Sequence, residues 1–475
     1  MGLRDRAMCR YIISSILIRV VLLFGFSLLY FPPTSKHMLK VHVFSFVYLL
    51  SMCLCFPHPV IIRRANPLRT RSARSSTQTF ISDLFTPSSS TTSSTIIGVA
   101  APMVSQSEFA FRQMCRNHNA KLTFTQMLHA KNFISSKAFR RDTFDFNPAV
   151  EGSANCAPVV GQLCGNDKLV LLEAAKIIQS EGIDGVDLNL GCPQRIAKKG
   201  FYGAFLLPQT DLVLDIVDHL SSNLQIPISV KIRVQSPETD LALCTGLQDA
   251  GASMITVHGR TVKENKTATR SNNFDAIKRI VDATSIPIIS NGGIEHFSDV
   301  ESCLAATNAA GVMSSEALLE NPSLFAGESF PATTAEWYLK QLRLAKEYLA
   351  IAEKYPPIGT GQSGGHSTIK AHVFKILYVA LDRYQDLRNE LGAPSVREIA
   401  HTKNIVRRLE ERIFAAIERG ELGELGELTP ANFQNSWYRR HRHPTTFQQL
   451  TESDEITNEE IRQRALERRG NNRRR

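Results

Sequence analysis

The sequence predicts an α/β protein built as a (β/α)8 TIM barrel and followed by a small all-α helical domain. Two observations predict the barrel: eight short apolar runs recur over about 230 residues, and amphipathic stretches separate most of them. A third observation, the end of strand-like runs after Pro331, predicts the helical domain. A doubly wound open sheet would show the same alternation with fewer strands.

The apolar runs are nearly continuous, which is typical of parallel strands buried on both faces. Apolar residues recur at helical spacing between them, as in 168–181 and 274–283. We therefore expect the barrel over residues 96–330. The expected strands lie within 96–103, 121–127, 158–164, 185–191, 228–234, 254–260, 287–293 and 309–316.

Residues 331–425 are expected to form the helical domain. Residues 426–475 form a basic, arginine-rich tail, and residues 63–95 are rich in Arg, Ser and Thr and predict a linker without a core. The expected helical stretches are 335–355, 367–384 and 397–418.

Residues 1–62 form an apolar N-terminal extension with runs at 11–31 and 41–56. The first run is long enough to cross a bilayer, and the second is marginal. Three interpretations stay open: a membrane anchor, an organelle-targeting leader, or a non-native extension. We expect membrane association only through residues 11–56. Otherwise the location is cytoplasmic or nuclear, and a membrane or mitochondrial location follows only if the extension is real.

The net charge of +10 is unevenly distributed along the chain. Residues 1–95 carry 11 Lys/Arg and 2 Asp/Glu, whereas residues 96–335 carry 20 and 24. Residues 336–419 carry 14 and 10. Because nucleic acid attracts basic surfaces, we expect RNA contacts mainly in the C-terminal part and only local basic patches on the barrel.

Polar or small residues stand at the C-terminal ends of the expected strands, where barrel enzymes carry their active sites. They are Met103, Gln162, Asn189 with Cys192, Lys231 with Arg233, His258 with Arg260, Asn291 with Gly292 and Gly293, and Ser315 with Glu316. The last two strands end in NGG and MSSEALLENP. Glycines there let backbone N–H groups approach a phosphate, although a plain tight turn would use the same pair.

Lys231, His258 and Arg260 would place cations beside the same pocket. A flavin needs positive charge near its N1–O2 edge, and Gln162 could supply amide contacts to the ring. Alternatively, His258 is a histidine with a purely structural role, and Lys231 is a lysine whose charge is solvated. Lys231 interrupts the buried run ISVKIRV, where an unpaired charge would be costly.

Cys192 is the candidate proton donor, because a free thiol is mostly protonated at neutral pH. Most cysteines are instead small buried hydrophobes, and we assign that role to the other eight. No C-x-x-C spacing occurs, so neither a zinc knuckle nor a disulfide framework is indicated, and no metal site is expected.

A series of motifs runs along the expected barrel and into the helical domain. They are APMVSQSEFAFRQMCR, QMLHA, VVGQLCGND, DLNLGCPQRIAKKGFYGAFL, VKIRV, TVHGRT, SNGGI, VMSSEALLENP and STIKAHVFKIL. From about Val99 to Phe325, and on into the helical domain, these motifs resemble the signatures of tRNA-dihydrouridine synthases. The loop around Cys192 resembles the eukaryotic branch that acts on D-loop uridines 16 and 17.

The resemblance implies FMN as cofactor, NADPH or NADH as reductant, and uridine in tRNA as substrate. It also implies that hydride reaches C6 of a flipped-out uracil and that Cys192, as general acid, protonates C5. The implied flavin contacts are Pro102, Met103, Val104, Gln162, Lys231 and His258, and the implied ribityl and phosphate contacts are Asn291, Gly292, Gly293, Ser315 and Glu316. The tRNA-contact candidates are Asn189, Lys198, Lys199, Arg260, Lys370, Lys375, Arg407 and Arg408.

Two departures from the family pattern stand out: Gln126 replaces a Pro before Met127, and Phe274 replaces a Trp. Two other functions remain possible. One is an FMN barrel of the dihydroorotate or dihydropyrimidine type that acts on free pyrimidines, and the other is a non-catalytic tRNA-binding protein. We expect a monomer.

Overall fold

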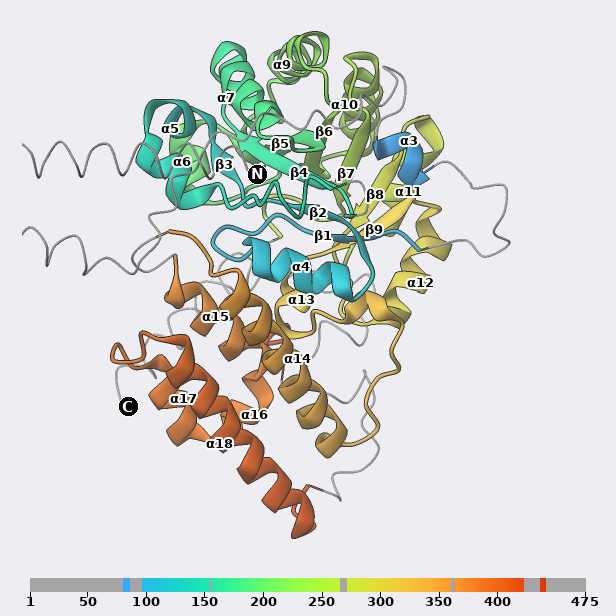
Figure 1. Ribbon diagram of the computed structural model, residues 1–475. Helices are drawn as coiled ribbons and strands as arrows, with labels where there is room; N and C mark the ends of the chain where they lie inside the picture. The colour runs from blue at the N-terminus through green and yellow to red at the C-terminus, as the bar shows by residue number, and fades with distance from the viewer. Residues whose placement is uncertain are drawn as a thin grey trace, which may run out of the picture. The chain divides into compact units, whose positions relative to one another are not determined.

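Parallel strands form one closed sheet in the computed structural model (Figure 1), which describes residues 80–85, 96–153, 156–264, 271–359, 364–422 and 436–440. The strand order is β2-β1-β9-β8-β7-β6-β5-β4-β3, and a β2–β4 pairing closes the sheet. The strands are β1 (Gly98–Ala100), β2 (Ala120–Phe124), β3 (Leu128–His129), β4 (Val159–Cys164), β5 (Gly185–Leu190), β6 (Ile228–Arg233), β7 (Met254–His258), β8 (Ile288–Asn291) and β9 (Gly311–Ser314).

The predicted TIM barrel is confirmed, because each of the eight apolar runs covers all or most of one strand. β3 adds a two-residue strand that pairs with β4 beyond the end of β2, so the barrel keeps eight strand positions. Every residue of β4 and β5 is buried. Burial on both faces explains why the sequences of these strands are continuously apolar and do not alternate between apolar and polar residues.

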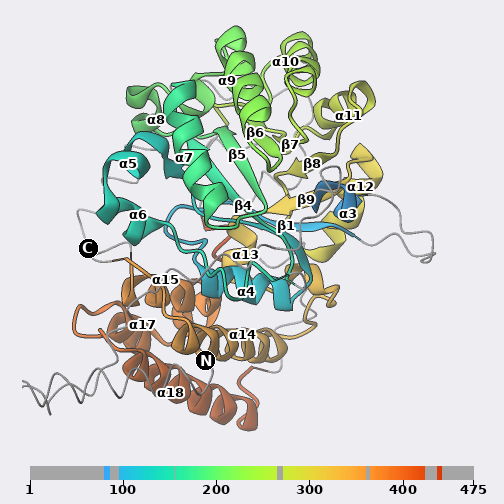
Figure 2. The ribbon, with the colours of Figure 1, turned by 45° about the horizontal axis from the view of Figure 1, so that its top comes forward.

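Helices surround the barrel (Figure 2). Side-chain caps fix several helix starts: Asp167 accepts N–H groups of α7, Ser236 of α10 and Asn273 of α11. The helices are α4 (Phe109–Asn117), α5 (Ala130–Ser135), α6 (Lys137–Thr143), α7 (Lys168–Ser180), α8 (Arg195–Gly200), α9 (Thr210–Asn223), α10 (Pro237–Asp249), α11 (Phe274–Ala283), α12 (Phe297–Thr307) and α13 (Glu316–Glu320).

The segment expected to be a linker is not without structure throughout, because α3 (Phe80–Phe85) lies inside it. Phe80 is 3% exposed and packs with Val99, Leu122 and other residues of the barrel interior. An added Cβ on Gly185, the first residue of β5, would lie 2.9 Å from the Phe80 ring. The apolar residues of α3 therefore plug the end of the barrel at which the strands begin.

The predicted helical domain is also confirmed. Its helices are α14 (Thr334–Lys354), α15 (His366–Ile376), α16 (Tyr378–Arg383), α17 (Gln385–Gly392) and α18 (Ile399–Glu418). α14 packs against α4 of the barrel (Figure 1). Glu108 joins the two parts: Tyr348 donates to its carboxylate at 2.8 Å, and Nε2 of His372 lies 3.0 Å from it.

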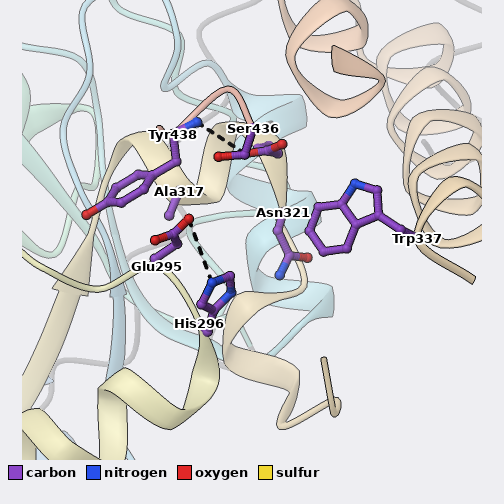
Figure 3. Close-up of a pocket in the computed structure, with 8 residues that line it drawn as sticks. Glu295, His296, Ala317, Asn321, Trp337, Ser436 and Tyr438 are labelled. Atoms are coloured by element: carbon purple, nitrogen blue, oxygen red, sulfur yellow. Dashed lines mark hydrogen bonds and ion pairs between the residues drawn. The ribbon is translucent and has the colours of Figure 1, made fainter. Parts of the chain in front are cut away.

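Within the predicted basic tail, the short segment 436–440 docks between the barrel and the helical domain. Nε of Arg439 lies 2.8 Å from Oε1 of Glu295, and the backbone N–H of Tyr438 donates to Glu320. Figure 3 shows this segment beside a pocket that is also lined by His296 and Trp337.

The apolar runs 11–31 and 41–56 lie outside the described residues. Within the described residues, no helix has both the length and the apolarity needed to cross a membrane.

Candidate active site

Strand register brings the predicted polar residues into rows on the inner face of the barrel. Asn189 pairs with Lys231 in β5 and β6. One step nearer the strand ends, Arg233 pairs with His258, which pairs with Asn291. Paired residues of neighbouring parallel strands face the same side, so residues predicted from separate strand ends lie on one face of the sheet.

A buried hydrogen-bond network forms the floor of this site. Nε2 of Gln162 donates to Asp187 at 2.8 Å, and Oγ of Ser229 donates to the same carboxylate at 2.7 Å. Nδ2 of Asn189 donates to Oε1 of Gln162 at 2.9 Å. Burial raises the pKa of Asp187 to about 6, although both hydrogen bonds act to lower it.

Asp187 and Ser229 are site residues that the sequence analysis missed. Their spacing in the sequence could have identified them. Asp187 precedes Asn189 by two residues, and Ser229 precedes Lys231 by two residues. Residues so spaced face the same side of a strand. Their roles depend on Gln162, which lies on a third strand.

Two backbone hydrogen bonds hold Cys192, one to strand β5 and one to the end of its own loop. Oδ1 of Asn189 accepts the backbone N–H of Cys192 at 3.0 Å, and the Cys192 carbonyl accepts the N–H of Ala204 at 3.2 Å. Gly203 has a φ of 65°, and an added Cβ would lie 2.9 Å from the Cys192 carbonyl oxygen. Only glycine therefore lets the loop close here.

Cys192 differs from most other described cysteines in its exposure. Cys192 and Cys156 are partly exposed, whereas Cys115, Cys164, Cys244 and Cys303 are buried. Burial raises the pKa of Cys164 and of Cys244 to about 12 and also raises the pKa of Cys115, which suits the role of small hydrophobes. Cys192 is thus a tethered thiol that solvent and a ligand can reach.

Two cations lie beside this thiol. The pKa of Lys231 is lowered to about 7, mainly by burial and in second place by the neighbouring guanidinium of Arg233. Arg233 is held in place because its Nε donates to the Gly191 carbonyl at 2.8 Å and its Nη1 to the Thr261 carbonyl at 3.1 Å. Among the described residues, Lys231 makes no hydrogen bond that would occupy its ammonium group.

The turn after β1 holds Pro102, Met103 and Val104 at the same end of the barrel. Val104 is 58% exposed, and Ser105 has a φ of 60°. Gln126 anchors this turn, because its Oε1 accepts the Ser105 N–H at 2.8 Å and its Nε2 donates to the Thr143 carbonyl at 2.8 Å. This departure from the family pattern thus has a structural role that sequence alone did not show.

Gly292 and Gly293 form a glycine cradle at the end of β8, which pairs with β9. Gly292 has a φ of 106° and Gly293 a φ of 74°. An added Cβ on Gly292 would lie 2.8 Å from Cδ2 of His258. Nδ2 of Asn291 donates to the Met313 carbonyl at 2.9 Å, which fixes the cradle to β9. Ser315 follows, and the short helix α13 begins at Glu316, which is exposed.

This arrangement fits FMN. Gly292 and Gly293 offer backbone N–H groups to a phosphate at the end of β8, and Lys231 offers a partly buried cation for an electron-rich ring edge. Hydrogen bonds with Asp187 and Asn189 fix the orientation of the Gln162 amide. Met103 and Val104 present apolar surface at the same end of the barrel. Among the described residues, no cluster of three or more His, Cys, Asp or Glu side chains could hold a metal ion.

The eight candidates for tRNA contact lie in different surroundings. Lys198 and Lys199 are exposed on α8, next to the Cys192 loop. Asn189 and Arg260 are buried at the mouth of the barrel. Arg407 pairs with Glu411 and Arg408 with Glu390, while Lys370 donates to the Ala393 carbonyl.

Lys375 is the most buried of the four candidates in the helical domain. It is 9% exposed, hydrogen-bonds to Gln106, and lies 5.4 Å from the Trp437 ring centre. Burial lowers its pKa to about 8. Lys375 therefore connects the helical domain to the turn after β1, which sequence spacing did not show.

A profile of the family described as dihydrouridine synthase (Dus) matches residues 99–414. The chain belongs to this family. The match includes the barrel strands from Val99 onward and most of the helical domain. The resemblance drawn from the motifs is thus confirmed at the level of the family.

Curated relatives agree with this assignment. A mouse protein named "tRNA-dihydrouridine(16/17) synthase [NAD(P)(+)]-like" is 39% identical over 297 residues, covering 62% of this chain and 58% of the relative. The Saccharomyces cerevisiae tRNA-dihydrouridine(16/17) synthase [NAD(P)(+)] is 34% identical over 352 residues, covering 72% and 80%. A human protein named "tRNA-dihydrouridine(20a/20b) synthase [NAD(P)+]-like" is 35% identical over 262 residues, covering 54% and 80%. The chain thus spans less than two thirds of the mouse relative.

Solved structures give a weaker likeness. N-(5'-phosphoribosyl)anthranilate isomerase from Pyrococcus furiosus aligns with a TM-score of 0.31 and 14% identity, covering 55% of this chain and 99% of that chain.

Proposed function

We propose that this protein is an FMN-dependent, NAD(P)H-driven tRNA-dihydrouridine synthase that reduces the C5=C6 bond of uridine, at positions 16 and 17 of the D loop. One observation carries the proposal. Cys192 is a partly exposed thiol whose loop is tethered, through Asn189, to the same polar network that orients Gln162. Membership in the family and the names of the mouse and yeast relatives support the substrate and the positions.

FMN, reduced by NAD(P)H, supplies the hydride when it is bound. The chain's own residues then have three tasks: to hold the uracil, to stabilise negative charge and to deliver a proton. Cys192 performs the last task by donating its Sγ proton to C5. Asn189 positions the donor, because its amide oxygen fixes the backbone N–H of Cys192.

Lys231 stabilises the negative charge. Its lowered pKa of about 7 means that removal from water disfavours the charged ammonium. An anionic group placed beside it would raise the pKa again and keep the ammonium charged. A lysine so placed favours an electron-rich ring edge more than an equally placed solvated lysine would.

The tRNA contacts are proposed for the exposed basic residues beside the Cys192 loop and for the helical domain. Lys198 and Lys199 are exposed within one short helix, α8, at the edge of the site. Phosphate contacts from such residues would place the substrate uridine over the barrel without reading its sequence.

The deciding experiment supplies the purified protein with NADPH and with tRNA from cells that lack dihydrouridine. Mass spectrometry then maps the reduced positions, and free uridine is tested in parallel. We expect a yellow protein that forms dihydrouridine at positions 16 and 17 of tRNA and leaves free uridine unreduced. A colourless protein that takes up no flavin would refute the proposal, and reduction of free pyrimidines alone would assign the chain to the other class of FMN barrel.

A further inference from the structure

Asn272 fills a notch between three glycines at the ends of β7 and β8. An added Cβ would lie 2.5 Å from Oδ1 of Asn272 if placed on Gly292, and 2.7 Å if placed on Gly259. On Gly293 it would lie 3.2 Å from Cβ of Asn272. The amide therefore borders the same glycine cradle that the site offers to a phosphate.

Both polar atoms of the Asn272 side chain are buried, and neither has a hydrogen-bond partner among the described residues. An amide offers two donor and two acceptor positions, and leaving them unmet in a buried place destabilises the fold. Its neighbour Asn273 differs, because it is exposed and its Oδ1 accepts the Ala276 N–H at 2.9 Å. Capping of α11 thus accounts for the Asn273 amide, whereas the Asn272 amide makes no hydrogen bond with the described residues.

We infer that Asn272 is a ligand of the bound cofactor and that its Nδ2 donates a hydrogen bond to the phosphate group of FMN. The inference rests on the proposed function, since it requires FMN at the cradle. A phosphate needs several donors, and the backbone of Gly292 and Gly293, with positive φ values of 106° and 74°, lies beside this amide. A neutral amide can donate to a phosphate without the cost of burying another charge.

The inference is tested by titrating flavin-free protein with FMN and, separately, with riboflavin, which lacks the phosphate. Flavin fluorescence reports binding, so no turnover is required. Asn272→Ala should weaken FMN about tenfold and riboflavin much less, because one hydrogen bond to a charged group is removed. Asn272→Asp keeps the shape but replaces the donor by a negative charge, so it should weaken FMN more than Asn272→Ala does.

Asn273→Ala is the matched control. It should lower the melting temperature because α11 loses its cap, and it should leave the affinity for FMN unchanged. The inference is overturned if both Asn272 variants bind FMN as the wild type does, which would mean that water satisfies the amide. It is also overturned if FMN and riboflavin weaken equally, which would place Asn272 away from the phosphate. If the wild type itself binds no FMN, the proposed function fails instead.

Discussion

Oδ1 of Asn189 accepts the backbone N–H of Cys192 at 3.0 Å, while Nδ2 of the same amide donates to Gln162 at 2.9 Å. The position of the Cys192 thiol is therefore coupled, through Asn189, to the position of the Gln162 amide. Gln162 is in turn held by Asp187 on the next strand. A change anywhere along this chain of hydrogen bonds should move the proton donor relative to the substrate.

Asn189→Ala should lower the turnover of tRNA by about 10- to 100-fold, because one amide positions the Cys192 backbone and Gln162 together. The rate at which NADPH reduces the bound flavin should stay near the wild-type value, since that step does not use the thiol. Rapid-mixing measurements separate the two steps. Equal loss in both would indicate general misfolding rather than positioning.

Cys192→Ala should leave FMN bound and nearly abolish dihydrouridine formation, because the variant lacks a proton donor for C5. Cys156→Ala is the matched control, since Cys156 is the other partly exposed cysteine of the described residues. Mass spectrometry of the tRNA product measures both variants. Wild-type turnover in Cys192→Ala would show that another group donates the proton.

Gln126→Ala should loosen the turn that carries Met103 and Val104, because both hydrogen bonds of this amide are removed. We expect a changed visible circular-dichroism spectrum of the bound flavin and a loss of about 1 kcal/mol in the free energy of unfolding. Gln385→Ala, at an exposed position in the helical domain, is the control. An unchanged flavin spectrum would exclude the proposed contact between this turn and the ring.

The raised pKa of the buried Glu320 side chain should make the stability of the protein depend on pH. Burial raises its pKa from an ordinary 4.5 to about 8, so the folded protein holds a proton that the unfolded chain releases between these values. The free energy of unfolding should therefore fall as pH rises through this interval. Glu320→Gln keeps an acceptor for the Tyr438 N–H, and urea unfolding near pH 5 and near pH 8 should show a smaller difference than in the wild type. If the variant and the wild type showed the same pH dependence, the raised pKa of Glu320 would be contradicted.

Charge reversal at Lys198 and Lys199 should weaken tRNA binding most at low salt, because both side chains are exposed. The slope of log K against log salt should fall by about 0.7 to 0.9 for each phosphate that a lysine no longer neutralises. Arg408→Glu should have a smaller effect, since its guanidinium already pairs with Glu390 at 2.7 Å. A salt-independent loss of affinity would mean that the double variant disturbs the Cys192 loop instead.

Much of the fold could be predicted because its determinants are local. The run VVGQLC became β4 and GVDLNL became β5, since continuous apolar residues can be buried on both faces. Cys192, Lys231 and the Gly292–Gly293 pair could be selected because a barrel places strand ends at one face. α3 was missed, because six residues within a polar stretch give too short a pattern, and its burial depends on the barrel interior.

The sequence by itself determined the barrel, the helical domain and the strand ends that carry the candidate site, because apolar periodicity and the order of the strands can be followed along the chain. Only the tertiary structure decided how those residues are used. It joined Gln162 to Asp187, buried Lys375 against Gln106, and left both polar atoms of Asn272 without partners among the described residues, beside the glycines. Such contacts depend on strand register and on packing between segments far apart in sequence, which no local pattern specifies.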